Sequence, residues 1–272
     1  MTGIFQYTFI QHAILACILA SVGCGIMGTY IVVKRIGFLA GGIAHSVLAG
    51  MGIAYFIGAS PLAGAMVAAL LSGILIGWIN LKWKQDEDIL IAAFWSVGMA
   101  IGIIFISRTE GYNIDLMSYL FGNILLVSSQ DLLLMAILDV VLVIIIALFY
   151  RQFLAATFDE EFSRLRGINI EFIYIVLLSM VSLTVVLLIQ IVGLILVLAL
   201  LILPAASATQ FSSSVTRMMI LSVVFSLLIT LTGLFASYAP DLPSGATIIV
   251  VAGIFYVLSI VGRKLAGKTG ND

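Results

Sequence analysis

Residues 172–216 read FIYIVLLSMVSLTVVLLIQIVGLILVLALLILPAASATQFSSSVT and contain no Asp, Glu, Lys or Arg. A helix that crosses the hydrocarbon core of a bilayer needs about 20 predominantly apolar residues, so this segment is long enough for two crossings. A soluble surface could not be built from such a segment. It therefore predicts a chain whose helices span a membrane.

The composition of the whole chain agrees with that prediction. Apolar residues make up 63% of the 272 residues and charged residues only 9%, whereas a soluble globular protein carries about 25% charged residues. So few charges cannot cover a soluble surface, and the lipid bilayer must contact most of the exterior. The net charge of -1 says nothing about nucleic acid, but the chain has no basic tract that could bind it, so we expect no nucleic-acid partner.

Charged residues mark where each span must end. No Lys or Arg precedes the first apolar run, so the N-terminus predicts a transmembrane helix and not a cleaved signal. The predicted fold class is all-α: a polytopic transmembrane helix bundle of about nine spans, forming a single domain over residues 1–272. The uncharged segments give one span each at 1–33, 89–107, 132–150, 218–240 and 242–262, and two each at 36–81 and 172–216.

Basic residues predict the orientation, because cytoplasmic loops carry an excess of Lys and Arg. An outside N-terminus with nine spans leaves only Arg108 on the outer side and puts the C-terminus in the cytoplasm. The residues that then lie inside are Lys34, Arg35, Lys82, Lys84, Arg151, Arg164, Arg166, Arg217, Arg263, Lys264 and Lys268.

Small residues predict close packing between helices. Gly98 and Gly102 are four residues apart, so they share a helix face and let another backbone approach. Cys17 and Cys24 also share a face but lie two turns apart, which is too far for a disulfide bond between them. We interpret both cysteines as packing residues.

The longest polar stretch, residues 151–171, contains a candidate amphipathic helix near 157–167. Thr157 and Glu160 fit a capping box that would start this helix, and Gly167 is placed to end it. Its apolar face is formed by Phe158, Phe162 and Leu165. Two interpretations stay open: a helix that rests on the lipid surface, or a docking helix that fits a groove on a soluble partner.

Ionisable residues at membrane depth are costly, and each is a candidate functional residue. His45 stands alone in an uncharged segment; its imidazole could bind zinc, manganese or iron, or could hydrogen-bond to a neighbouring helix. Asp139 lies near the middle of its span, where it could contact a passing cation or stay protonated. Near the predicted outer face, cation attraction and plain solvation are both open for Glu110, Asp115 and Asp131.

The chain carries no catalytic constellation. The HExxH and GxSxG patterns are absent, and no second mid-membrane Asp pairs with Asp139. Residues 262–269, GRKLAGKT, fit the P-loop pattern, but a predicted transmembrane helix precedes them and three residues follow. The strand and helix that a P-loop requires are therefore missing. We expect no bound cofactor and no enzymatic activity, so any ATP hydrolysis must come from another chain.

Six motifs follow one another along nearly the whole chain. They are Gly42-Ile-Ala-His45-Ser-Val-Leu-Ala-Gly50; Glu87-Asp88 with Trp95-Ser-Val-Gly-Met99; Asp115-Leu-Met-Ser-Tyr-Leu-Phe-Gly-Asn123; Phe158-Asp-Glu-Glu-Phe162 with Gly167-Ile168; Val192-Gly193 through Pro204-Ala-Ala; and Leu242-Pro-Ser-Gly-Ala-Thr247. Each is short, but the ordered set resembles the permease subunits of metal-type ABC importers, which serve zinc, manganese and iron.

That resemblance implies a homodimeric, multi-pass permease domain in the plasma or inner membrane. Each copy would rest on a cytoplasmic ATP-binding subunit, and an extracellular solute-binding lipoprotein would deliver the metal ion, which is the substrate. Transport would proceed by alternating access, with His45 and Asp139 as candidate metal contacts. The short cytoplasmic helix would couple the ATPase to the spans through Phe158, Asp159, Glu160, Phe162 and Arg164.

The sequence departs from the family at one informative position. Many members carry Asp four residues before the motif histidine, on the same helix face, whereas this chain has Gly41 there. Either another acidic residue completes the site, or coordination by His45 is weaker and transient, which suits release. Two other functions stay open: an ABC permease for a metal chelate such as a siderophore or cobalamin, and a self-contained ion channel or secondary transporter.

Overall fold

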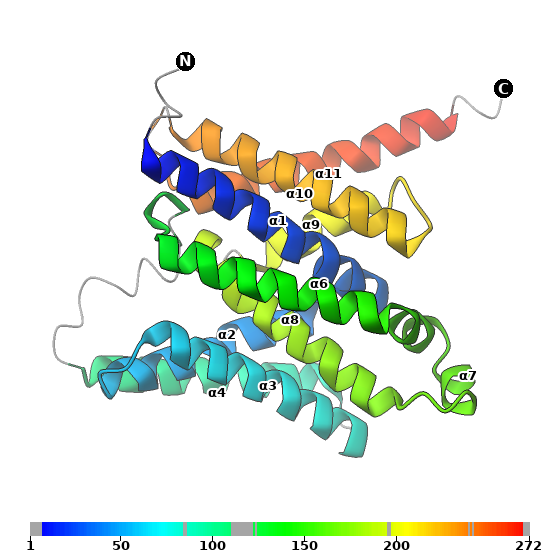
Figure 1. Ribbon diagram of the computed structural model, residues 1–272, viewed down its shortest axis with the longest axis horizontal. Coiled ribbons are helices and arrows are strands. Elements are labelled where there is room, and N and C mark those ends of the chain that lie inside the picture. The colour runs from blue at the N-terminus through cyan, green and yellow to red at the C-terminus, as the bar shows by residue number, and fades with distance from the viewer. Residues whose placement is uncertain are drawn as a thin grey trace. The chain divides into compact units, whose positions relative to one another are not determined.

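The computed structural model describes residues 7–83, 86–109, 122, 124–194, 197–238, 240 and 242–268, and the regular elements in these ranges are all helices (Figure 1). The all-α prediction is confirmed. The elements are α1 (Thr8–Lys34), α2 (Gly37–Phe56), α3 (Pro61–Trp83), α4 (Glu87–Ser107), the short 3-10 helix η2 (Ile124–Leu126), α6 (Ser129–Phe158), α7 (Glu160–Leu165), α8 (Ile170–Val192), α9 (Val197–Ala208), α10 (Val215–Tyr238) and α11 (Ser244–Lys268).

Eight of these helices are long and apolar enough to cross a membrane: α1, α2, α3, α4, α6, α8, α10 and α11. The prediction of about nine spans differs at residues 172–216, where the structure has one long helix and the short apolar α9. At 1.5 Å per residue, the 12 residues of α9 reach about 18 Å, which is less than the roughly 30 Å of a hydrocarbon core. Gly193, with φ +77°, lies in the turn that separates α9 from α8.

The chain divides into two compact units. The first contains Met1–Val32, Met117–Ile137 and Leu187–Asp272, and the second contains Val33–Leu116 and Leu138–Val186. In the first unit α9, α10 and α11 pack together. In the second unit α2 packs against both α3 and α4.

Small residues set the packing of α1 in the first unit. Gly25 meets Val223 of α10 so closely that a methyl group would collide with the Val223 backbone. One turn earlier, the hydroxyl oxygens of Ser21 and Thr230 lie 3.4 Å apart. The earlier residue of α1, Ser21, meets the later residue of α10, Thr230, so the two helices are antiparallel. Both cysteines of α1 are fully buried and neither forms a disulfide bond within the described residues, which agrees with a packing role.

The second unit is built around α2, whose neighbours approach at glycine. Gly50 faces the backbone of Gly64 on α3, and the two helices run antiparallel because Ser46, earlier on α2, meets Ser72, later on α3. A Cβ atom placed on Gly98 of α4 would lie 2.6 Å from the Ser46 Cα atom. The prediction of a close helix approach at Gly98 is therefore confirmed.

Candidate metal contacts and the short helix between spans

His45 lies on α2 and its imidazole stacks on the indole of Trp95 from α4. The ring centroids are 4.0 Å apart and the planes differ by 11°. The Nδ1 atom of His45 is buried and has no hydrogen-bond partner in the part of the chain that the structure describes. The alternative of a histidine hydrogen-bonded to a neighbouring helix through this nitrogen is therefore not what the structure shows.

The packing of α2 on α4 explains why these two rings meet. Gly42 lies against Ile91, and Ser46 lies against Gly98. Both contacts advance in the same direction along the chain, so α2 and α4 are parallel. His45 stands between Gly42 and Ser46, and Trp95 stands between Ile91 and Gly98, so the register brings the two side chains face to face. Sequence reasoning noted Trp95 only within a motif and did not place it beside His45.

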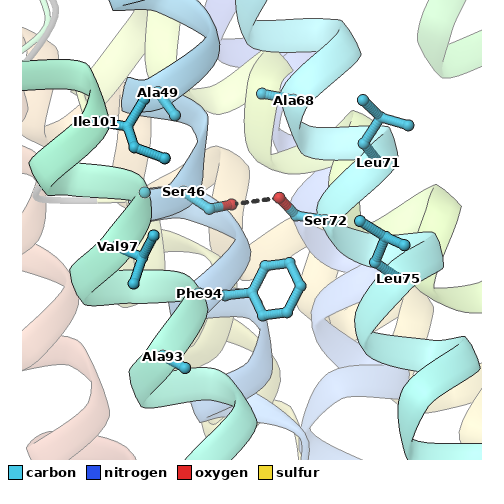
Figure 2. Close-up of a pocket in the computed structure, with 11 residues that line it drawn as sticks. Ser46, Ala49, Ala68, Leu71, Ser72, Leu75, Ala93, Phe94, Val97 and Ile101 are labelled. Carbon is cyan, nitrogen blue, oxygen red and sulfur yellow. Dashed lines mark hydrogen bonds between the residues drawn. The ribbon is translucent and has the colours of Figure 1, made fainter.

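A pocket of about 470 Å³ opens beside this contact, between α2, α3 and α4. Figure 2 shows the Ser46 and Ser72 hydroxyl groups on its wall, joined by a hydrogen bond with the oxygens 2.8 Å apart. The Ser46 oxygen also lies 2.8 Å from the carbonyl oxygen of Ile43. The remaining side chains around the pocket are apolar: Ala49, Ala68, Leu71, Leu75, Ala93, Phe94, Val97 and Ile101. Such a lining offers a cation two paired hydroxyls and no charged side chain.

Asp139 lies on the buried face of α6. Its side chain is 5% exposed, and it shares a helix face with Leu142, Ile146 and Phe153, which are also buried. Neither carboxylate oxygen has a hydrogen-bond partner among the described residues. A carboxylate in this position is costly unless a cation, water or proton compensates it.

The structure does not gather the candidate ligands into one cluster. In the described ranges, no group of three or more His, Cys, Asp or Glu side chains is placed to hold a metal ion. No hydrogen bond joins His45 to Asp139, because neither carboxylate oxygen has a partner among the described residues. Among the residues expected near the outer face, Asp131 accepts hydrogen bonds from the backbone N–H and the hydroxyl of Ser128 at the start of α6, while Glu110 and Asp115 lie outside the described residues.

The short helix predicted near 157–167 is present, but it begins later. α6 continues through Phe158, and the Thr157 hydroxyl donates to the carbonyl of Phe153 at 2.7 Å, so the capping box that starts at Thr157 is wrong. Asp159 is the N-cap of α7 instead, because its carboxylate accepts from the Phe162 N–H at 2.9 Å. The predicted end at Gly167 is confirmed: its φ is +77°, and the following Ile168 N–H donates to the Ser163 carbonyl.

Apolar side chains are exposed around α7. Phe158, Phe162 and Leu165 are 65%, 47% and 86% exposed. Arg166 lies over the Phe162 ring, with its guanidinium carbon 4.6 Å from the ring centroid. Because Phe158 ends α6, the three apolar residues belong to two helices and not to one continuous helical face.

Lys34, the last residue of α1, contacts both α7 and α8. Its ammonium nitrogen is 3.7 Å from a carboxylate oxygen of Glu160 and 5.4 Å from the centre of the Tyr174 ring. Only 12% of the Lys34 side chain is exposed, whereas 58% of Glu160 is exposed. Sequence reasoning used Lys34 only for orientation, and no local pattern signals a partner so far along the chain.

Comparisons with known proteins cover nearly the whole chain. Residues 6–263 match the ABC 3 transport family. A probable metal transport system membrane protein of Chlamydia pneumoniae is 41% identical, over 96% of this chain and 91% of its own length. The manganese transport system membrane protein MntC of Halalkalibacterium halodurans is 34% identical, over 94% of this chain and 88% of its own length.

A solved structure has the same architecture. The structure described as PsaBC from Streptococcus pneumoniae in complex with Fab aligns with a TM-score of 0.85 and 30% identity, over 95% of this chain and 93% of that one. The eight apolar helices agree with a multi-pass protein of the plasma membrane. The chain therefore belongs to the ABC 3 transport family, as a membrane-spanning permease of metal transport.

Proposed function

We propose that this chain is the permease subunit of an importer that moves a divalent transition metal ion across the membrane, driven by a separate ATP-binding subunit. Its family membership and the name of the Chlamydia relative support metal as the substrate. A second chain must supply the ATPase, because the P-loop-like residues 262–269 follow a transmembrane pattern directly and α11 already includes residues 262–268. In a genuine P-loop these residues would form a loop that follows a strand and opens a helix.

The observation that carries this proposal is His45: a mid-helix imidazole in a predicted span, with a buried nitrogen that no described protein group engages. A neutral imidazole nitrogen is a ligand for first-row divalent metals and has little affinity for the chelated, ligand-saturated ion of a siderophore. Asp139 supplies a second, separate contact for a cation, since its carboxylate is buried without a partner in the described structure.

Manganese is the metal that we propose first. The relative in Halalkalibacterium halodurans and another in Listeria monocytogenes, which is 32% identical, are both named manganese transport proteins. Imidazole and carboxylate are suitable ligands for manganese, and the two cysteines that would favour a softer metal are buried in the packing of α1. Zinc and iron accept the same two ligand types and are the competitors to compare.

We propose that α7 is the coupling helix. An exposed apolar cluster of Phe158, Phe162 and Leu165 outside a hydrocarbon-spanning segment suits a groove on a protein partner. Asp159, Glu160 and Arg164 would shape this segment: the first caps it, the second pairs with Lys34, and the third gives its last turn a positive charge that suits the helix dipole.

The remaining architecture of the transporter follows from the same proposal. The N-terminus lies outside, which puts α7 in the cytoplasm. Because α10 runs antiparallel to α1, and α11 antiparallel to α10, Arg217 and the basic end of α11 lie on that side too, although α9 is shorter than a full span. A second copy of the chain completes a homodimer, and an extracellular solute-binding lipoprotein presents the metal. The antiparallel and parallel contacts within each unit agree with successive crossings of α2, α3 and α4.

Reconstitution in liposomes with the ATP-binding subunit tests the proposal. We expect uptake of Mn²⁺ that requires ATP and that His45→Gln lowers by at least tenfold while the complex stays assembled. Phe162→Glu should abolish metal-stimulated ATP hydrolysis and uptake without affecting membrane insertion.

Three outcomes would contradict separate parts of the proposal. A response to a ferric siderophore but not to Mn²⁺, Zn²⁺ or Fe²⁺ would overturn transport of the free ion. Uptake in vesicles that lack any ATP-binding subunit would overturn the ATP-driven mechanism. Unchanged coupling in Phe162→Glu would remove α7 as the coupling helix.

A further inference from the structure

The side chain that holds His45 in place is Trp95. The two rings are nearly parallel at 4.0 Å between centroids, so one whole face of the imidazole is covered by indole. Rotation of the imidazole about its own side-chain bonds would break this stacking. The ring nitrogens lie at the edge of the imidazole and stay outside the contact.

Histidine ligands in proteins are normally oriented in another way. The nitrogen that does not bind metal usually donates a hydrogen bond to a carboxylate, a backbone carbonyl or water, and this partner fixes the plane of the ring. No described residue forms a hydrogen bond with either ring nitrogen of His45, so this usual support is missing whichever nitrogen meets the metal. Among the aromatic contacts of the described residues, Trp95 is the one ring that stacks on the His45 imidazole.

The backbone around the pair is rigid enough for stacking to serve this purpose. One turn before His45, Gly42 lies against Ile91, and directly after it Ser46 lies against Gly98. These two close approaches bracket the ring pair and define the register of α2 on α4. The separation of the two rings is therefore set by the helix backbones.

We propose that Trp95 is the positioning residue for His45, fixing the imidazole plane by stacking where a hydrogen-bonded partner would ordinarily do so. This inference rests on the proposed role of His45 as a metal contact. Stacking holds the plane but adds no negative charge and does not polarise the imidazole. The His45 imidazole would then bind the metal ion in the plane of its ring, beside the indole. It would be a well-oriented but weakly basic ligand.

A first experiment asks whether a metal ion reaches His45 at all, using the full-length chain in nanodiscs. In a Trp78→Phe/Trp83→Phe variant, Trp95 is the one remaining tryptophan of the three. Added Co²⁺, which quenches fluorescence at short range, should quench Trp95 saturably, and His45→Gln in the same background should abolish the saturable part. Quenching that is absent, or that persists without His45, would overturn the role of His45 and with it the proposed metal contact.

A second experiment asks whether stacking positions the ligand. Trp95→Leu and Trp95→Met keep apolar bulk without a flat ring, while Trp95→Phe keeps a ring. Phe94→Leu is the matched control, because Phe94 is the preceding residue and faces the neighbouring pocket (Figure 2). Loss of an outer partner of a metal ligand typically costs about 10-fold to 100-fold in metal affinity.

We therefore expect the KM for Mn²⁺ uptake to rise about tenfold or more in the Leu and Met variants with a smaller change in maximal rate. Trp95→Phe should recover most of the affinity, and Phe94→Leu should match the wild type. If His45 passes the quenching test, yet either non-aromatic variant that assembles keeps the KM of Phe94→Leu, stacking does not position the ligand.

Discussion

Gly98→Ala is the substitution that tests the α2–α4 contact most sharply. The added Cβ atom would lie 2.6 Å from Ser46 Cα, 3.0 Å from Ser46 Cβ and 3.3 Å from the Ser46 carbonyl oxygen. Carbon atoms in contact prefer about 3.5–4.0 Å, so the helices must separate by about 1 Å. The nearest atom belongs to the backbone, which cannot move aside as a side chain can. Overpacking of this kind typically costs about 1–3 kcal/mol.

Alanine substitutions at two other glycines serve as controls for the loss of stability in Gly98→Ala. Gly253→Ala on α11 places a methyl group where nothing lies within 4 Å, and alanine within a helix is favoured over glycine by about 0.5–1 kcal/mol. Gly42→Ala is intermediate, because its nearest neighbour is the Cγ2 methyl group of Ile91 at 2.8 Å, while the closest backbone atom lies farther away, at 3.3 Å. The three variants differ in one methyl group and in what that group meets.

Thermal unfolding in detergent micelles, monitored by the loss of monodisperse protein, ranks the stability of the three variants. We expect Gly253→Ala to equal or exceed the wild type, Gly42→Ala to fall slightly below it and Gly98→Ala to be the least stable. Manganese uptake should fall furthest in Gly98→Ala, because the shift of about 1 Å is applied beside His45 and Trp95. A Gly98→Ala protein as stable as Gly253→Ala would refute the close approach of α2 and α4.

The remaining predictions concern α7 and α6. Asp159→Ala should cost α7 about 1 kcal/mol by freeing the Phe162 N–H, and it should speed amide hydrogen exchange in residues 160–165, whereas Thr157→Ala should not. The opposite ranking of the two variants would restore the capping box at Thr157. Asp139→Asn should leave the protein at least as stable as the wild type by unfolding in micelles, because it removes a buried charge without removing volume, but it should reduce metal uptake. Wild-type uptake in Asp139→Asn would mean that this carboxylate does not contact the ion.

Sequence reasoning located the helices because the bilayer imposes a simple rule on composition. Uncharged segments of the required length became helices at α1 to α4, α6, α8, α10 and α11. The rule says where an apolar segment is long enough, but not how its length is divided, so α9 was expected as a full span. Backbone conformation at Gly193 and the Ser- and Thr-rich end of the segment decide that division, and neither changes the count of charges.

The boundary of α7 was misplaced for a related reason. The first charged residue after a span was taken to end its helix, but α6 continues past Arg151 as far as Phe158. Helical hydrogen bonds do not depend on whether the side chains lie in lipid or in water. Thr157 therefore falls inside the last turn of α6 and bonds back to Phe153, and the cap passes to the next suitable residue, Asp159.

Local sequence patterns could not predict the contact between His45 and Trp95, although the residues that cause it can be named in the sequence. Gly42 and Gly98 permit close approach, and once two parallel helices meet at those glycines the register leaves His45 opposite Trp95. What the sequence lacks is the pairing of the helices itself. Periodicity describes one helix at a time, so the partner of a small-residue face is found only when the fold is known.

A resident metal site and a transport path need ligands of different binding strength. A resident site gathers several ligands and supports them with hydrogen-bonded partners, whereas a path must bind an ion and then release it. The described residues hold no three-ligand cluster, and Gly41, four residues before the histidine, has no side chain that could bind an ion. In the proposed mechanism, one oriented imidazole and one separate carboxylate therefore act as successive weak contacts. In this mechanism the delivering lipoprotein provides the tight binding of the metal ion at the outer side. This chain provides a path whose weak contacts let the ion move on.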